Sequence, residues 1–381
     1  MINRVLLCCL WAAGHAAAPT THAQAATAPA AEAAAAPSAE VPPRPAEVLA
    51  VPPALRALLR ERVIQPGPSR EQRLQRLGAM LFDPHGLNLQ YDVQATTTVA
   101  ETWQQRRANC LSFTLLFVTL AREAGIQAQV QEVDQVVSWF QQNTAVYNVG
   151  HVNAGVTLNG RHVTAELDRT VLYGRRGPRP ISDARALAHF YNNRGAERMD
   201  AGDALSARRY YDAALAQDER FVAAWNNRGV LALRQGQWQQ AQRDFDHALQ
   251  VSPSNTAALA NASALLQRTG QYRQAARLQQ RLQRLRREDP FVQYVLGVQA
   301  ERDGDLIGAI GHYRRAVRLY DGAHPFHFAL ARAYLQSGRL RAAEGELRRA
   351  HALATAPMQA RYQAKIERLQ RMRHASAGTA R

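Results

Sequence analysis

Lysine is almost absent from this chain of 381 residues: Lys365 is the only one, and arginine supplies the other 46 basic side chains. Cysteine is also scarce, since three residues cannot build a disulfide framework or a cysteine-rich metal site. After the first 25 residues no segment approaches 18 consecutive apolar residues, so we expect no membrane-spanning helix in the mature chain. With 46% hydrophobic and 20% charged residues, the composition excludes a wholly disordered chain and a multi-span membrane protein.

The net charge of +16 is unevenly distributed. Residues 186–381 carry 30 basic and 17 acidic residues, a net charge of +13, which leaves +3 for residues 1–185. We therefore expect any anionic partner to bind the C-terminal half.

The first 25 residues have the pattern of a secretory signal peptide. Arg4 and the apolar run Val5–Ala13 precede Ala23-Gln24-Ala25, which offers a small-residue cleavage site. We therefore expect an exported, periplasmic protein of a bacterium, for which nucleic acid is a disfavoured partner. Residues 26–48, rich in Ala and Pro, are predicted to form a disordered linker.

Cleavage at that site would remove Cys8 and Cys9. Leu7 precedes Cys8 where a lipidated cysteine needs a small residue, so we expect no lipoprotein anchor at Cys8 or Cys9. The mature chain would then hold Cys110 as its one cysteine, with no second cysteine to pair with in an oxidising compartment.

Small residues recur every 34 residues in the C-terminal half. A glycine recurs at Gly202, Gly236, Gly270, Gly304 and Gly338, and an alanine follows five residues later at Ala207, Ala241, Ala275, Ala309 and Ala343. Glycine favours the left-handed turn that ends a helix, and small residues let two helices approach closely. The period therefore predicts a repeated helix-turn-helix unit.

This pattern resembles the tetratricopeptide repeat over about residues 188–357. The copy from Val222 to Asn255 matches best, whereas the third departs most, at Leu259, Ser263, Gln279 and Leu282. The resemblance implies an all-α solenoid of about five repeats over residues 186–357, with a concave face that binds a peptide or another protein. A spacer or an intramolecular brace is the alternative. Residues 358–381 are predicted to be a capping helix and tail.

An arginine-rich segment lies within the third repeat. Seven arginines and no acidic residue occur between Arg268 and Arg287, and four of them fall at helical spacing: Arg273, Arg277, Arg281 and Arg284. They form either an ordinary solvated face or a site for an acidic segment or an anionic envelope polymer.

Residues 49–185 have a different character. Helices are predicted over Pro53–Val63, Ser69–Phe82 and Val99–Arg107, and a further one from Cys110 to about Gly125. Asn109 is a good N-cap for this last helix, which is apolar on nearly every side and is therefore expected to be central. Cys110 would then lie in its first turn, where unpaired N–H groups and the helix dipole stabilise a thiolate.

A β-hairpin is predicted between residues 151 and 168, after a strand near Ala128–Val133. Asn159-Gly160 between two alternating runs gives a two-residue turn in which Leu158 faces Arg161. Continued outward, this register places His151 opposite Asp168. Such an arrangement is typical of a Cys-His-Asp thiol site, and a buried structural cysteine beside a cross-strand ion pair is the alternative.

Asn109–Phe113, Leu120–Ile126 and the hairpin resemble the transglutaminase-like, papain-type cysteine enzyme superfamily over about residues 97–175. The resemblance implies an α+β core in which the cysteine helix packs on an antiparallel sheet. It also implies Cys110 as nucleophile, His151 as base and Asp168 as the residue that orients it.

Other site assignments follow from the residue types. Trp103 or Gln104 could donate to an oxyanion together with the backbone N–H of Cys110. His162 shares the hairpin face of His151 and is expected to be an exposed strand residue. We predict no metal site and no cofactor.

Two functions fit these features. The first is an envelope thiol enzyme that hydrolyses an amide bond or transfers its acyl group, with the repeats presenting a protein substrate. The second is a scaffold or adaptor in which the transglutaminase-like fold is not catalytic. A redox-sensing thiol is a third possibility, which would need an accessible Cys110 but would not need Asp168.

Overall fold

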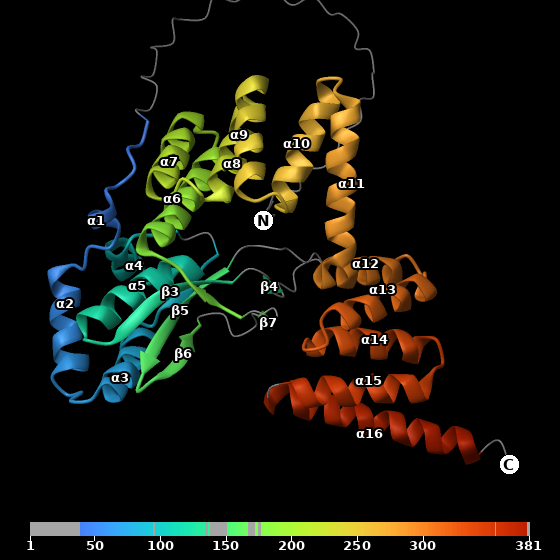
Figure 1. Ribbon diagram of the computed structural model, residues 1–381. Coiled ribbons are helices and arrows are strands. Elements are labelled where there is room, and N and C mark those ends of the chain that lie inside the picture. Colours follow the sequence, from blue (N-terminus) through green and yellow to red (C-terminus); the bar gives the residue numbers. More distant parts are fainter. Residues whose placement is uncertain are drawn as a thin grey trace, which may run out of the picture. The chain divides into compact units, whose positions relative to one another are not determined.

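The computed structural model describes residues 39–378 apart from 94–95, 134–135, 138–150, 167–171, 174–176 and 355 (Figure 1). The predicted signal peptide and the first part of the predicted linker lie outside the described residues. Within the described ranges, no helix combines the length and apolarity needed to cross a membrane.

The N-terminal part combines helices with a small sheet. Its helices are α1 (Pro45–Val48), α2 (Pro53–Leu59) with a π-helical turn over Arg60–Ile64, α3 (Arg70–Phe82), α4 (Val99–Gln105) and α5 (Cys110–Glu123). The main sheet is antiparallel, in the order β6-β5-β3-β8, and comprises β3 (Gln127–Val133), β5 (His151–Leu158), β6 (Arg161–Ala165) and β8 (Arg179–Pro180). Two smaller pairs are β1 (Gln90–Tyr91) with β2 (Arg107–Ala108), and β4 (Val136–Val137) with β7 (Leu172–Tyr173).

Helix α5 is the central element of this part. The Asn109 side chain caps it by accepting a hydrogen bond from the Ser112 N–H at 2.9 Å, and Gly125 follows its end with φ of +75°. Both are as predicted. The helix is buried on almost every side and packs on β3 and β5. Burial of its apolar side chains therefore fixes where its N-terminus, and Cys110, must lie.

Helix α4 ends before its predicted limit at Arg107. Its last residue is Gln105, and Arg106 adopts a left-handed conformation with φ of 57°. Arg107 and Ala108 then pair with β1 as a short strand. The chain is thereby turned into position for Asn109 to cap α5.

The hairpin formed by β5 and β6 has the predicted register as far as it is described. Asn159 and Gly160 both have positive φ, at 48° and 75°, as a type I′ turn requires. Leu158 pairs with Arg161, and the register continues to Ala154 and Ala165. Asp168 lies outside the described residues, so its pairing with His151 stays a prediction.

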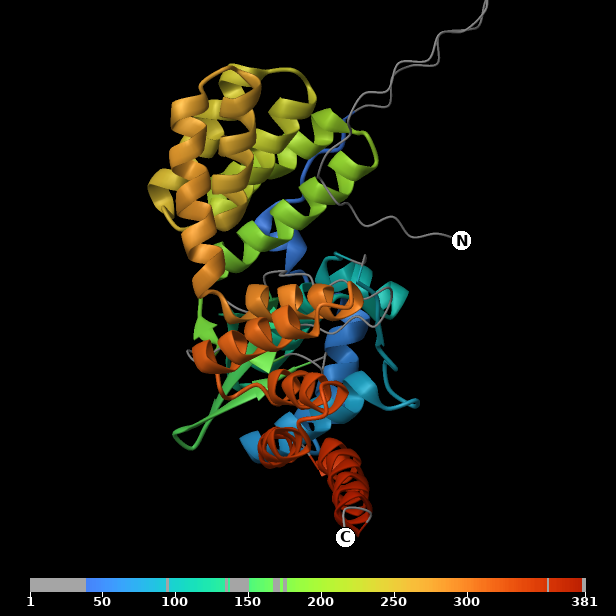
Figure 2. The ribbon, with the colours of Figure 1, turned by 90° about the vertical axis from the view of Figure 1, so that its right-hand side faces the viewer.

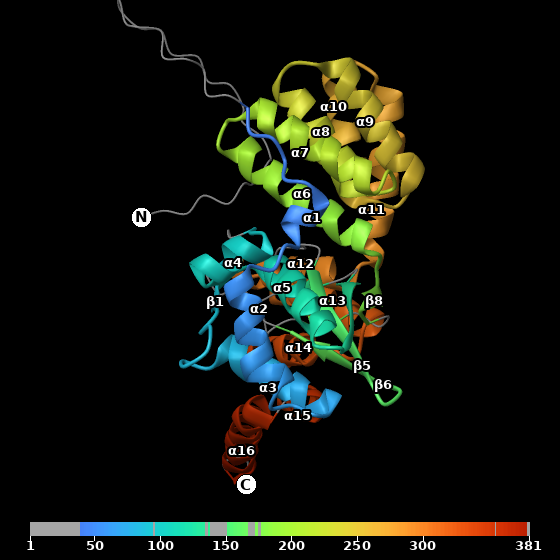
Figure 3. The same cartoon turned by 90° about the vertical axis from the view of Figure 1, so that its left-hand side faces the viewer.

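The prediction of a disordered linker over residues 26–48 is wrong for residues 39–48. Val48 is fully buried in the hydrophobic core, and α1 begins at Pro45. Residues 39–44 form hydrogen bonds with the two helices of the first repeat, α6 (Asp183–Asp200) and α7 (Ala204–Gln217). Figure 3 shows this segment passing α7 and α6 before it reaches α1. Composition alone misses these contacts because one charged side chain anchors an otherwise low-complexity segment.

The C-terminal half is a series of antiparallel helix pairs, coloured green to red in Figure 2. The helices are α6 (Asp183–Asp200), α7 (Ala204–Gln217), α8 (Val222–Arg234), α9 (Trp238–Val251), α10 (Thr256–Arg268), α11 (Tyr272–Glu288), α12 (Pro290–Arg302), α13 (Leu306–Leu319), α14 (His324–Gln336), α15 (Leu340–Leu353) and α16 (Ala356–Gly378). All five glycines of the 34-residue period have positive φ, between 73° and 82°. The last helix covers apolar residues of α15 with Tyr362, Ile366 and Leu369.

A close glycine–aromatic contact joins the two helices of a repeat. A Cβ on Gly229 would lie 2.6 Å from the ring of Phe245, and Gly195 and Gly297 have equivalent contacts with Tyr211 and Tyr313. In the third repeat Ser263 replaces the glycine, and its hydroxyl donates to the carbonyl of Ala275 at 3.1 Å. This larger residue fits because Gln279 stands where the first, second and fourth repeats have an aromatic ring.

We expect Gly229→Ala to lower the free energy of unfolding by about 1–3 kcal/mol, because the added methyl group meets the Phe245 ring. Gly345→Ala is the matched control: its Cβ would meet nothing within 4 Å on α15, so it should stabilise by up to about 1 kcal/mol. Urea unfolding curves measure both effects. Equal midpoints for the two variants would contradict the packing argument.

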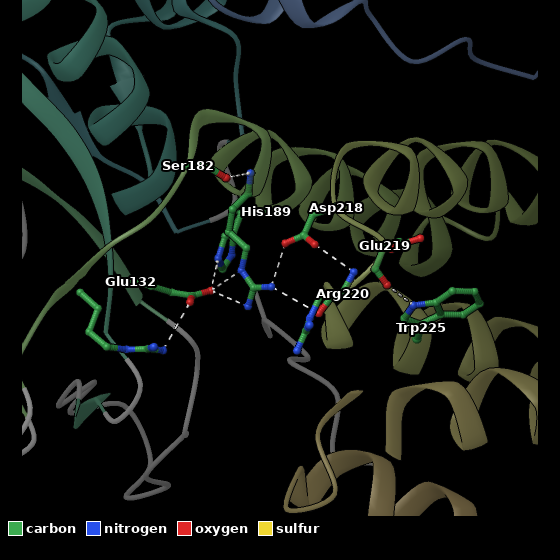
Figure 4. A network of polar contacts seen from close by, with 9 residues as sticks. Glu132, Ser182, His189, Asp218, Glu219, Arg220 and Trp225 are labelled. Carbon is green, nitrogen blue, oxygen red and sulfur yellow. Dashed lines mark hydrogen bonds and ion pairs between the residues drawn. The ribbon is translucent and has the colours of Figure 1, made fainter. Parts of the chain in front are cut away.

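A partly buried carboxylate joins the sheet to the first repeat (Figure 4). Glu132 on β3 accepts hydrogen bonds from His189 Nε2 at 2.7 Å and from Arg185 Nε at 3.2 Å, and both donors lie on α6. Arg185 also donates to Asp218, at 2.9 Å from Nη1. Burial alone would raise the pKa of Glu132, but His189 and Arg185 outweigh it and lower the pKa to about 2.

Because the Glu132 pKa is lower in the folded state, its stabilisation is present above about pH 4.5 and is lost as the pH falls through about 2. Glu132→Gln should lower the free energy of unfolding at pH 7 by about 3–5 kcal/mol. The variant should also lose less stability than the wild type when the pH falls from 7 to 3. Glu123→Gln removes a more exposed pair with Arg56 and should cost about 1 kcal/mol or less. Urea unfolding at pH 7 and pH 3 tests this, and equal losses in the two variants would refute it.

Candidate functional site

The thiol of Cys110 lies at the N-terminal end of the central helix. Cys110 is the first residue of α5, is a free cysteine and is partly exposed. The first N–H groups of a helix have no acceptor within the helix and carry its positive dipole end. The thiol therefore lies beside backbone N–H donors that have no partner within the helix, on a residue that is partly exposed to solvent.

His151, the first residue of β5, contacts this thiol. Its side chain forms a hydrogen bond with Cys110 and is 7% exposed. On its other side, His151 Nε2 lies 2.7 Å from Glu166 Oε2. The structure thus brings Cys110 and His151 together, as the sequence predicts, and adds a carboxylate that the sequence analysis did not select.

Glu166 is a carboxylate that lies next to the imidazole, whereas Asp168, which the sequence selects for this role, lies outside the described residues. The β5–β6 register puts Glu166 opposite Asn153, whose side-chain nitrogen lies 3.3 Å from Glu166 Oε2. Glu166 is therefore the diagonal cross-strand neighbour of His151 on the same face. A glutamate is long enough to span a diagonal pair, so register together with side-chain length could have identified it.

The three groups of this Cys110–His151–Glu166 cluster are electrostatically linked. Burial alone would lower the pKa of His151, but its hydrogen bonds and charge interactions with Cys110 and Glu166 prevail and raise the pKa to about 10. A raised histidine pKa stabilises the folded chain fully below about pH 6.5, and this contribution is lost as the pH rises through about 10. Across the neutral range the imidazole is therefore an imidazolium beside the sulfur.

A second layer of hydrogen bonds holds the start of α5. Asn109 Nδ2 donates to Thr96 Oγ1 at 2.9 Å, and the backbone N–H of Thr97 donates to Ser112 Oγ at 2.7 Å. All four residues are buried. They connect the segment before α4 to the first turn of α5 and so fix the position of Cys110.

The other residues selected from the sequence have less defined roles. The Trp103 ring lies under the Arg106 guanidinium, 3.7 Å from its central carbon, and Gln104 is exposed, so their oxyanion roles stay predictions. His162 is exposed on β6, as expected, and lies 3.1 Å from Thr157 Oγ1. Within the described ranges, no group of three or more His, Cys, Asp or Glu residues is placed to hold a metal ion.

The four arginines of the third repeat lie on one helix. Helix α11 buries Ala275 and Leu282, whereas Arg273, Arg277, Arg281 and Arg284 are all exposed. Arg277 also borders a cavity of about 370 Å³ whose apolar lining includes Phe245 and Leu278. The predicted basic stripe is present, and its binding role stays a prediction.

Comparison with known families identifies the repeats. Residues 222–255 match the tetratricopeptide repeat family, with the same limits as the copy that the sequence pattern singles out. The match confirms the tetratricopeptide repeat prediction for this copy. No match was found among the curated proteins. The resemblance of residues 97–175 to the transglutaminase-like superfamily stays an expectation.

Solved structures of other proteins align with part of the chain. MamA from Desulfovibrio magneticus RS-1 is 21% identical over 44% of this chain and 94% of its own, with a TM-score of 0.25. YrrB, a TPR protein with an unusual peptide-binding site, is 20% identical over 47% of this chain and 92% of its own, also with a TM-score of 0.25. TM-scores this low do not establish a common fold. The family match and the helix pairs are the basis for the repeats.

We expect Glu166→Gln to lower the pKa of His151 from about 10, because the variant removes one of the two anionic partners of the imidazole. Asp168→Asn, two residues further along the chain, should lower it less. Titration of the His151 ring signals by NMR measures both shifts. A larger shift in Asp168→Asn would restore the original assignment of the orienting carboxylate.

Proposed function

We propose that this chain is an exported thiol enzyme that hydrolyses an amide bond, or transfers its acyl group to an amine, on a peptide or protein substrate. The observation that carries the proposal is the hydrogen-bonded series Cys110, His151 and Glu166 at the N-terminus of α5. Nucleophilic catalysis by a thiol needs these three parts: a sulfur, a base that holds its proton, and a group that orients the base.

Acylation would proceed from the ion pair. The Cys110 thiolate attacks the substrate carbonyl carbon, a C–S bond forms, and the carbonyl oxygen becomes an oxyanion. The backbone N–H of Cys110 is a candidate donor to that oxygen, because the Asn109 cap takes the N–H of Ser112. The His151 imidazolium then gives its proton to the leaving amine as the C–N bond breaks.

Deacylation would reverse the roles. Water or an acceptor amine loses a proton to neutral His151 as it attacks the thioester, and the C–S bond breaks to regenerate the thiolate. Glu166, fixed by Asn153, holds Nε2 throughout and stabilises the imidazolium each time it forms. Nδ1 is then the ring nitrogen left for proton exchange with the sulfur and the substrate.

The repeat array would bind a peptide or protein and so bring the substrate to the thiol. Tetratricopeptide repeats support such a role because paired helices present an extended surface. Export to the periplasm is part of the proposal and is supported by the pattern of residues 1–25. In an oxidising compartment Cys110 would have no second cysteine of the mature chain as a partner.

The alternative function is a scaffold in which the cluster is structural. A buried histidine and glutamate can stabilise a hairpin without chemistry, and the repeats would then account for the whole function. The partial exposure of Cys110 favours the enzyme, since a purely structural cysteine is commonly buried.

The rate at which iodoacetamide alkylates Cys110, measured against pH, tests the proposal. We expect fast alkylation that persists well below pH 8.5, the ordinary thiol pKa, because the imidazolium stabilises the thiolate. At pH 6.5, His151→Ala should slow the reaction at least about tenfold. Mass spectrometry of the peptide that contains Cys110 separates it from Cys8 and Cys9.

His162→Ala is the matched control, since His162 is an exposed histidine of the same hairpin and should leave the rate unchanged. An ordinary thiol titration that His151→Ala does not alter would overturn the enzyme proposal and favour the scaffold.

A further inference from the structure

A peptide-like segment of the chain occupies the first repeat. Residues 39–44 are extended and contain two consecutive prolines, Pro42 and Pro43. Their contacts with α6 and α7 come from one acidic side chain and from backbone atoms. We call this segment the strap.

Glu40 is the charged anchor of the strap. Its Oε1 accepts hydrogen bonds from Arg194 Nη2 at 3.0 Å and from the Tyr210 hydroxyl at 2.5 Å, and Oε2 pairs with Arg198. Tyr210 is fully buried, and the Arg194 side chain is 19% exposed. Four of the strap-binding side chains, Arg194, Arg198, Tyr210 and Ser206, form what we call the carboxylate socket.

Backbone contacts complete the recognition of the strap. The N–H of Glu40 donates to Ser206 Oγ at 2.8 Å, and the carbonyls of Ala39 and Pro43 accept from Arg209 and Tyr191, at 2.8 Å and 2.7 Å. These contacts do not depend on strap side chains other than Glu40, and Val41 points to solvent with 74% exposed. The site therefore recognises one carboxylate on an extended backbone. Prolines keep that backbone extended at a low entropic cost.

The socket is connected to the cap of the thiol helix. Arg194, which holds Glu40 through Nη2, also donates from Nη1 to the carbonyl of Thr96 at 3.3 Å. Thr96 Oγ1 in turn accepts from Asn109, the N-cap of α5. Three consecutive hydrogen bonds thus join the strap carboxylate to the residue before Cys110.

We infer that the carboxylate socket is a binding site for an extended, proline-containing acidic peptide, and that the strap fills it in cis until such a peptide replaces it. We further infer that occupation of the socket sets the reactivity of Cys110 through Thr96 and Asn109. This second part rests on the proposed function, whereas the first part does not.

A partner peptide has to compete with the strap of the same chain, and this competition limits which peptides can bind. A segment of the same chain is present at a high effective concentration, so a modest intrinsic affinity is enough to keep the site filled. A partner peptide competes only when it supplies the same carboxylate and backbone geometry. A neutral peptide would leave Arg198 and the Tyr210 hydroxyl without the Glu40 carboxylate, and Arg194 with its 3.8 Å pair to Glu197. This loss is costly because Tyr210 is buried and both arginines are partly buried.

The binding experiment uses a fluorescent peptide that copies residues 38–46, titrated into the full chain. The peptide should bind Glu40→Gln at least about tenfold more tightly than the wild-type chain, because the variant weakens the internal competitor. Glu47→Gln is the control: Glu47 belongs to α1 and pairs with exposed Arg44, so this variant should bind as the wild type does. The same peptide carrying Glu40→Gln should not bind.

Two results would overturn the binding site. One is equal affinity of the peptide for the wild-type and Glu40→Gln chains, and the other is equal affinity of the acidic and neutral peptides for Glu40→Gln. Circular dichroism of each variant establishes that a change in affinity does not come from unfolding.

The coupling is tested by alkylation of Cys110 at pH 6.5. Glu40→Gln should slow alkylation about threefold or more, because Arg194 loses the Glu40 carboxylate, keeps the 3.8 Å pair with Glu197 and holds Thr96 less firmly. Saturating acidic peptide should restore the rate. An unchanged rate of alkylation would overturn the coupling between the socket and Cys110. The peptide titration would then test the binding site alone. If alkylation does not depend on His151, the proposal of a thiol enzyme is rejected. The peptide titration and its dependence on Glu40 would still test whether the carboxylate socket binds an acidic peptide.

Discussion

A helix that is apolar on nearly every side constrains the N-terminal part of this protein. Helix α5 has to be enclosed, and β3, β5, α4 and the segments before it supply the enclosing surfaces. Enclosure also explains why its polar end is so fully hydrogen-bonded. Asn109 Oδ1 accepts from the N–H of Ser112 at the start of the helix. Thr96 then accepts from the Asn109 amide, and Ser112 Oγ accepts from the Thr97 N–H, beside Cys110. The reactive group and the packing are thus two aspects of one helix.

The sequence predicts the parts of the fold that depend on the conformational preferences of neighbouring residues in the chain. Asn109 as a cap, Asn159-Gly160 as a turn and the glycine of each repeat follow from backbone preferences that neighbours cannot easily override. The hairpin register follows too, because the two-residue turn at Asn159-Gly160 fixes which residues of the two strands face each other. These rules are enough to bring His151 to the correct strand position.

Residues that act through tertiary contacts were harder to predict. Glu166 lies two residues before the position directly opposite His151, and only the length of its side chain brings it to the imidazole. The strap looks disordered by composition because its ordering comes from Arg194 and Tyr210, which lie more than a hundred residues away. Helix α4 ends early because Arg106 adopts a left-handed conformation that no local signal in the sequence requires.

The hydrophobic core does not end where the repeats begin. One buried cluster extends from Val48 through α5 and the sheet to Phe190, Tyr210 and Phe221, whereas the later repeats have separate, smaller clusters. Helices α6 and α7 therefore cover the core of the α+β part as well as forming the first repeat of the array. Over evolutionary time, repeats could be gained or lost at the far end without opening that core, but α6 and α7 could be replaced only together with the surface they cover.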